Sequence, residues 1–326
     1  MINTARRAIS IAVCIIVSVM LVACSGKDTV MNLDGFDVTR DIYRYVVVNS
    51  RLDIESAHGG ADVWKSDEAD TAERELSDSI KLYLSKLYTV CSLGRELGVE
   101  WNCDEIKASA VLERNSAVED AGSEKEFQRQ LESAYMNDDV YDFIVSNNIL
   151  NEELPSLIAA SDEVASSAEL LRELFLGDSF VRVKQILVGG ENAGTSEENR
   201  ARAERILARL RDGEDFDELS REYNNDLYMF QNDDGYYIMR GTRSEAFEEA
   251  AFSLGVGEIS DIIETDAGYS IIMRCEKDEG YFDRHADLVE AEYTETLYTE
   301  RFEERQAEIL AAVTELPDGT DIRTLS

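Results

Sequence analysis

The first half of the chain is patterned for amphipathic helices. Between residues 73 and 97, apolar side chains recur at spacings of three or four, which places them on one helical face: Leu76, Ile80, Leu84, Leu87 and Cys91. The same reasoning predicts further helices at 102–114, from Ser123 onward and at 138–150. In front of them, residues 30–38 predict a short strand and a turn, followed by a helix N-cap at Thr39. The pattern therefore predicts a helical N-terminal domain.

The hydrophobic period changes after Asp178. Residues 180–188 are rich in β-branched side chains with polar residues between them, as expected for a strand. Helices and two more strands follow in the order β-α-α-β-α-β, which is typical of a small α+β domain. We expect Ser196, Asp215 and Ser244 to be helix N-caps, and the strands to occupy 236–239 and 269–274.

A long amphipathic helix is expected again between residues 283 and 313, where apolar residues pair at spacings of four. A lone terminal helix must bury its apolar stripe, and the N-terminal helices are the expected partner. The α+β domain would then be inserted between the two halves of a helical domain. The acidic segment from Glu152 to Leu176, interrupted by Pro155, is interpreted as the passage into the inserted domain.

The N-terminus has the pattern of an export signal. Two arginines precede an apolar run from Ala8 to Val22, which is short for a membrane-spanning helix. The run ends in Leu21-Val22-Ala23-Cys24, which resembles the lipobox of bacterial lipoproteins. Cleavage would follow Ala23, and acylated Cys24 would hold the chain at a bilayer, since each buried CH₂ contributes about 0.8 kcal/mol. A plain anchor helix with an incidental cysteine is the alternative.

Composition narrows the function further. The 326 residues include 32 Lys+Arg against 68 Asp+Glu, a net charge of −36, and 44% are hydrophobic. Such a charge repels phosphate backbones, so we expect no nucleic-acid partner. The two histidines, His58 and His285, are far apart and give no local signature of a metal site or a catalytic triad. We therefore expect no metal and no cofactor.

Two local patterns bear on metal binding and disulfide formation. Counting back from Gly235 as position six of a calcium loop puts Phe230 at position one, where aspartate is required, so an EF-hand is rejected. After signal cleavage the remaining cysteines are Cys91, Cys103 and Cys275. A Cys91–Cys103 disulfide and unpaired, buried thiols both fit this spacing, and the two alternatives stay open.

Three segments carry a family resemblance: VRVKQILV at 181–188, GEDFDELSREYNND at 213–226 and AFEEAAFSLGVGEISDIIETDAGYSII at 246–272. In this order and spacing they resemble the parvulin-type peptidyl-prolyl isomerase domain. With the lipobox and the flanking helices, the chain is similar to PrsA- and SurA-like extracytoplasmic foldases. The implied fold is α+β, a helical chaperone-like domain with an inserted parvulin-type domain. Its expected boundaries are 1–23 for the signal peptide, 24–176 for the helical domain, 177–278 for the parvulin domain and 279–326 for the closing helix.

The resemblance also implies site residues. Asp226 falls at the family's acidic or cysteine position, and Gln185 and Ser270 replace its two histidines, so these three are the candidate catalytic residues. Candidates for binding the substrate proline are Phe247, Ile238 and Arg243, the last in place of the usual methionine. Gln185 and Ser270 are expected to hydrogen-bond with each other and with Asp226. Arg243 is a hypothetical ion-pair partner of Asp226. In the alternative interpretation these are ordinary loop, strand and core residues.

These implications define an expected function. The chain would be a membrane-anchored foldase on the extracytoplasmic face, isomerising X–Pro bonds in unfolded or newly exported polypeptides. The barrier to that rotation is about 18–20 kcal/mol, and no bond is made or broken. Its partners would be these polypeptides and, through Cys24, the lipid bilayer, and a homodimer is left open. The alternatives are a chaperone whose parvulin domain only binds peptide, and a structural envelope lipoprotein.

Overall fold

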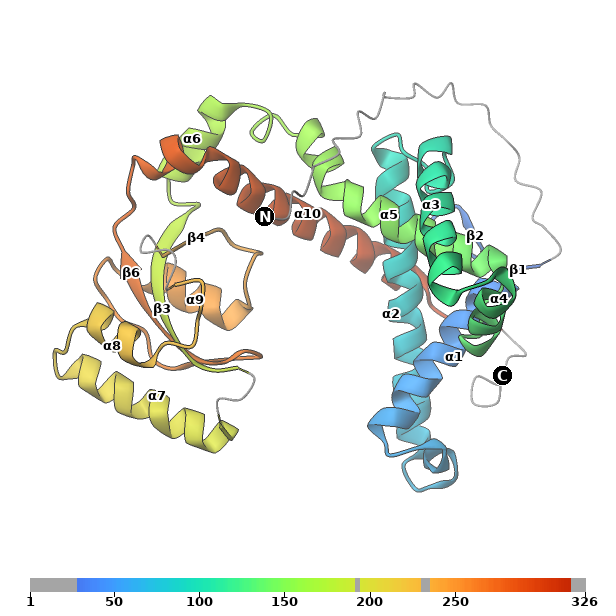
Figure 1. Cartoon of the computed structure of the whole chain (residues 1–326), viewed down its shortest axis with the longest axis horizontal. Coiled ribbons are helices and arrows are strands. Elements are labelled where there is room, and N and C mark those ends of the chain that lie inside the picture. Colours follow the sequence, from blue (N-terminus) through green and yellow to red (C-terminus); the bar gives the residue numbers. More distant parts are fainter. Residues whose placement is uncertain (1–27, 191–193, 230–234, 318–326) are drawn as a thin grey trace. The chain divides into compact units, whose positions relative to one another are not determined.

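The computed structural model describes residues 28–190, 194–229 and 235–317 (Figure 1). The chain divides into two compact units, one formed by 1–157 with 301–326 and the other by 158–300. The lipobox and Cys24 lie outside the described residues. Within the described ranges, none of the helices combines the length and the apolar character that crossing a membrane requires.

The first unit begins with an antiparallel hairpin of β1 (Thr29–Leu33) and β2 (Phe36–Thr39). The chain then enters α1 (Arg40–Ala57), whose first turn is capped by the Thr39 hydroxyl, which accepts from the Ile42 amide at 3.3 Å. The predicted N-cap is therefore confirmed. A 3₁₀ turn, η1 (Ala61–Lys65), leads from α1 towards α2 (Ala69–Glu96).

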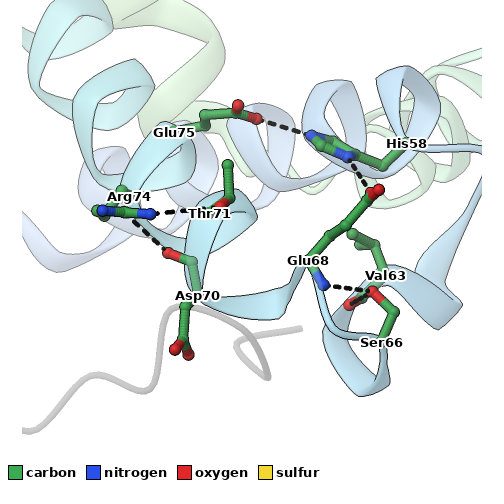
Figure 2. A network of polar contacts seen from close by, with 8 residues as sticks. All are labelled: His58, Val63, Ser66, Glu68, Asp70, Thr71, Arg74 and Glu75. Carbon is green, nitrogen blue, oxygen red and sulfur yellow. Dashed lines mark hydrogen bonds and ion pairs between the residues drawn. The ribbon is translucent and has the colours of Figure 1, made fainter.

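His58 ties the end of α1 to α2 (Figure 2). Its Nε2 lies 2.7 Å from a carboxylate oxygen of Glu75, and its Nδ1 lies 3.2 Å from one of Glu68. Because a carboxylate only accepts, both hydrogen bonds form at once only when the imidazole is doubly protonated. The bonds to Glu75 and Glu68 accordingly raise the pKa of His58. The charged form of His58 thus fastens the α1–α2 connection.

Helices make up the rest of the first unit: α3 (Asp104–Ala121), α4 (Glu124–Ser133) and α5 (Asp138–Ser161). The apolar stripe predicted on α2 is buried, with Leu76, Ile80, Leu84 and Cys91 at 0% exposure. Ile309 at the end of α10 (Tyr281–Ala312) and Val313 just beyond it belong to the same core cluster. The N-terminal helices therefore share a core with the last part of the C-terminal helix, whose first part, up to Glu300, belongs to the second unit.

Two details of the first unit differ from expectation or decide between alternatives. Pro155 lies inside α5, which continues to Ser161 instead of breaking there, and Leu154 and Ile158 on either side are fully buried. Burial of that face thus outweighs the hydrogen bond that proline cannot donate. Cys91 and Cys103 form no disulfide; Cys91 is a buried thiol, and Cys103 sits at the N-cap position of α3.

The second unit contains a four-stranded antiparallel sheet in the order β4-β3-β6-β5. Its strands are β3 (Val181–Gly189), β4 (Tyr236–Ile238), β5 (Ile263–Thr265) and β6 (Gly268–Cys275). Its helices are α6 (Ala168–Leu176), α7 (Ser196–Arg211), α8 (Phe216–Tyr223) and α9 (Glu245–Ser253). The fold is therefore α+β with an inserted sheet domain, as expected, although the short strand β5 was not foreseen.

Each face of this sheet has its own apolar core. Alternate residues of β3 and β6 pack with α7 and α8 on one face, including Ile186, Val188 and Ile271. The intervening residues, with β4, pack with α9 on the other face (Figure 1). The cap of α7 was misassigned by one residue: Thr195, with Glu198, forms the capping box, and Ser196 is the first helical residue. The Asp215 cap of α8 is confirmed, since it accepts from the Glu218 amide at 2.9 Å.

Candidate functional site

The two residues at the expected histidine positions meet on the α9 face of the sheet. Gln185 stands opposite Ile272 and Leu187 opposite Ser270, so Gln185 and Ser270 are diagonal neighbours on one face. The Gln185 amide Nε2 donates to the Ser270 Oγ at 3.1 Å. The expected hydrogen bond between them is therefore confirmed. Ser270 is buried, while Gln185 is partly exposed.

Two asparagines bring the chain after α8 alongside β3. β4 pairs only with residues 181–183 of β3, which leaves the rest of that edge without a strand. Asn224 fills it: its Oδ1 accepts from the Leu187 amide at 2.8 Å, and its Nδ2 donates to the Gln185 carbonyl at 2.7 Å. The Asn225 amide adds a bond to the Leu187 carbonyl at 2.8 Å. Asp226 follows directly and is thereby fixed beside the edge of β3.

Asp226 has a different partner from those expected. One carboxylate oxygen accepts from the Tyr228 amide at 3.0 Å, and the other accepts from the Tyr236 hydroxyl at 2.6 Å. Within the described part of the chain, Asp226 makes no hydrogen bond with Gln185 or Ser270. The catalytic candidates thus form two separate polar groups on neighbouring segments.

The hypothetical ion pair between Arg243 and Asp226 is wrong. The Arg243 guanidinium lies over the Tyr236 ring, 5.7 Å from its centroid, and donates to the Thr242 carbonyl at 2.8 Å. The backbone amides of Thr242 and Arg243 both donate to buried Glu248 at 2.9 Å, which fixes this turn. Arg243 therefore contacts the ring of Tyr236, the residue whose hydroxyl binds Asp226.

Tyr236 is the site residue that sequence reasoning missed. Burial, followed by the hydrogen bond to Asp226, raises the pKa of Tyr236 well above its ordinary value, so its hydroxyl keeps its proton. Its ring stacks on that of Tyr228, with centroids 5.0 Å apart and planes at 16°. A signal was present: in a strand that pairs with β3, Tyr236 shares the face of Ile238, which was already assigned to the site.

Gly235 allows β4 to approach. Its φ of +78° lies in the left-handed region, and a Cβ atom there would lie 2.5 Å from the Val183 carbonyl oxygen. Next to it is a pocket of about 340 Å³ whose walls include Tyr228, Tyr236 and Arg243. The pocket therefore lies beside Tyr228 and Tyr236, which both donate hydrogen bonds to Asp226.

The two apolar candidates lie in the core. Ile238 has no exposed surface and Phe247 is 5% exposed, and both pack in the cluster between the sheet and α9. This burial suits the interpretation of both as core residues. Their contact with a substrate proline stays a prediction.

The chemistry available is hydrogen bonding around a partly apolar surface. Gln185 and Ser270 offer amide and hydroxyl groups, and Tyr236 offers a hydroxyl held by a carboxylate. Among the described residues, no three His, Cys, Asp or Glu side chains gather in a way that would hold a metal ion. Rotation about an amide needs no proton transfer, so such groups match that reaction without a titrating histidine.

Known proteins share these features. Residues 181–276 match the family model for the rotamase, or PPIC-type PPIase, domain. The sheet unit is therefore a parvulin-type domain, of the class of peptidyl-prolyl isomerases. The chain as a whole is similar to PrsA foldases.

Individual relatives show how far the similarity extends. The foldase protein PrsA of Caldanaerobacter subterraneus subsp. tengcongensis is 28% identical over 283 residues, which cover 82% of each chain. The PrsA of Bacillus subtilis is 31% identical over 138 residues, 42% of this chain and 44% of that one. Among solved structures, PrsA from Bacillus anthracis is 20% identical, covering 71% of this chain and 94% of the other, with a TM-score of 0.35.

Proposed function

We propose that this protein is a membrane-anchored foldase that catalyses cis-trans isomerisation of X–Pro bonds in newly exported polypeptides. The observation that carries the proposal is the parvulin-type sheet, with the Gln185–Ser270 bond on one face and Asp226 fixed at its edge. A thousandfold acceleration requires about 4 kcal/mol of preference for the twisted amide over the planar one. Polar groups held in place before the substrate arrives supply such a preference.

Each polar group has a role in this proposal. The Gln185 amide and the Ser270 hydroxyl bind the peptide backbone on either side of the proline. The Tyr236 hydroxyl turns from Asp226 towards the amide nitrogen of the proline, whose lone pair becomes a hydrogen-bond acceptor as it loses conjugation in the twisted amide. The stacked rings of Tyr228 and Tyr236 exclude water from one side.

Exchange measured by NMR on a short X–Pro peptide tests the activity. The protein used is the chain from Ser25 onward, which contains every residue that the structure describes. We expect faster exchange, lost in the Asp226→Ala and Ser270→Ala variants with unchanged circular dichroism. Exchange that both variants retain would reject the assigned site.

A second function is a chaperone whose parvulin domain binds peptide without turning it over. The observation that favours it is the 2.6 Å bond to Tyr236, which already engages the Asp226 carboxylate. Suppression of client aggregation by a protein that does not accelerate exchange would select this function.

The membrane anchor is a separate part of the proposal. It rests on the lipobox, with Cys24 as the acylated residue and the extracytoplasmic face as the location. Fractionation of cells expressing the Cys24→Ala variant tests it: we expect wild type in the membrane and the variant released. Retention of both in the membrane would favour the plain anchor helix.

A further inference from the structure

The largest cavity described in the first unit is a groove of about 740 Å³ between the β1–β2 hairpin and helices α1, α2, α3 and α5. Its floor is aromatic, formed by Phe36, Tyr88, Trp101 and Phe143. Phe36 contacts Tyr88, Tyr88 contacts Phe143, and Phe143 contacts Trp101, with centroid separations of 6.3 Å, 5.7 Å and 5.1 Å. Phe36 and Trp101 are partly exposed, whereas Tyr88 and Phe143 are buried. Val111 on α3 adds an apolar wall that is 55% exposed. The volume lies within the range of ligand-binding clefts.

Carboxylates surround this aromatic floor. Five aspartates line the groove, namely Asp28, Asp37, Asp41, Asp139 and Asp142, against two cations, Lys107 and Arg114. Arg114 is already engaged by Glu124 at 2.8 Å and by Asp138 at 2.7 Å, neither of which lines the groove. The groove therefore carries an excess of negative charge that its own cations do not balance.

None of the five aspartates is compensated by a salt bridge within the described part of the chain, and Asp139 and Asp142 lie one turn apart on α5. Among the described residues, no cationic group lies within salt-bridge distance of Asp139 or Asp142. Burial, together with the like charges of Asp138 and Asp139, raises the pKa of Asp142 against the lowering effect of Arg114. A cation bound in the groove would stabilise the ionised carboxylates of Asp139 and Asp142.

We propose that this acidic groove binds unfolded polypeptide segments in which lysine or arginine flanks an aromatic or aliphatic side chain. The proposal rests on the foldase function proposed above, which brings unfolded chains to the protein. The apolar side chain packs on the aromatic floor, and the cations face the rim, where aromatic faces also attract them. The groove selects segments by charge and apolarity, independently of proline.

The test compares two fluorescent, proline-free peptides built from Phe, Leu and Gly, one carrying lysines and the other glutamines in their place. Binding to the chain from Ser25 onward is followed by fluorescence anisotropy. We expect the lysine peptide to bind, and to bind more weakly as salt is added. Equal binding of the glutamine peptide would overturn the charge selection.

Paired variants separate the groove from the general charge of the protein. The loss of two ion pairs at exposed aspartates should weaken binding to D139N/D142N about three- to tenfold. The matched control is D53N/D78N, which removes the same charge from exposed positions outside the groove and should change binding less than about twofold. Equal weakening in both variants would overturn the proposal in favour of non-specific attraction.

The same measurements would reveal either of two other occupants of the groove. Higher peptide affinity in a variant ending at Pro317 would assign the groove to the chain's own last residues. A dimer seen by sedimentation, lost in D139N/D142N and dissociated by the peptide, would assign it to a second copy. Either result overturns the proposal.

The X–Pro exchange assay distinguishes this failure from failure of the proposed function. No parvulin residue is changed in D139N/D142N, so exchange should match that of the unaltered chain. Loss of peptide binding with exchange intact removes only the groove proposal.

Discussion

Replacing Asn224 with alanine tests whether an asparagine takes the place of a missing strand beside the candidate site. The Asn224 side chain accepts from the Leu187 amide and donates to the Gln185 carbonyl, and β4 does not extend along β3 as far as either group. An unsatisfied buried group costs about 1–3 kcal/mol, and partial burial favours the lower part of that range. The two groups together therefore cost about 2–4 kcal/mol. At 1.4 kcal/mol per tenfold change, amide exchange at Leu187 should accelerate about 30- to 1,000-fold.

Hydrogen exchange measured by NMR on β3 checks this value. Asn224→Asp is an informative companion: it keeps an acceptor for the Leu187 amide but sets a second oxygen against the Gln185 carbonyl, so exchange at Leu187 should also be faster than in wild type. Asn225→Ala is the matched control, since its side chain accepts only from the Gly189 amide at 3.2 Å. Exchange at Leu187 that stays at the wild-type rate in Asn224→Ala would refute the reasoning.

Three further predictions concern separate parts of the molecule. Tyr236→Phe removes the hydroxyl bonded to Asp226, and we expect X–Pro exchange to slow about tenfold or more if the hydroxyl serves the twisted amide; faster exchange would show instead that it blocks the acid. The carboxylates of Glu75 and Glu68 raise the pKa of His58 in the folded protein. The stabilisation that charged His58 contributes is therefore full below its pKa in the unfolded chain, and it is lost as the pH rises through its pKa in the folded protein. The melting-temperature difference between wild type and His58→Gln should shrink from about pH 6 to pH 9, and a constant difference would contradict this. Leu84→Ala should destabilise the first unit by about 2–5 kcal/mol and Leu82→Ala, 42% exposed, by far less; urea unfolding followed by tryptophan fluorescence reports this unit, where both tryptophans lie, and equal losses would count against the burial argument.

The periodicity of the chain was enough to predict most of its elements. Leu76, Ile80 and Leu84 are spaced for a helical face and are fully buried. Helix N-caps such as Thr39 could also be predicted, because a cap depends on residues that are close in sequence. Errors arose where tertiary burial competes with local preference. Pro155 favours a break, yet the buried residues beside it hold α5 together.

The candidate site was only partly readable from the sequence. Gln185 and Ser270 were paired correctly because the resemblance to the parvulin domain places both at its histidine positions on adjacent strands. The partner of Asp226 was predicted wrongly. Two side chains compete for it, that of Tyr236, ten residues away in a short edge strand, and that of Arg243, seventeen residues away in a turn. Charge alone favoured Arg243, but a turn fixed by buried Glu248 and the reach of the Tyr236 hydroxyl decide the contact.

The arrangement around Asp226 links the two functions proposed for the parvulin domain. A carboxylate satisfied by Tyr236 at 2.6 Å is stable without substrate, so the resting site has no exposed, unpaired charge. An X–Pro segment must either leave that bond in place and use the remaining donors, or exchange it for one of its own. The first course gives a binding module and the second an isomerase. In the proposed site Gln185 and Ser270 bind the peptide backbone in both courses, so the Asp226–Tyr236 hydrogen bond is what distinguishes them.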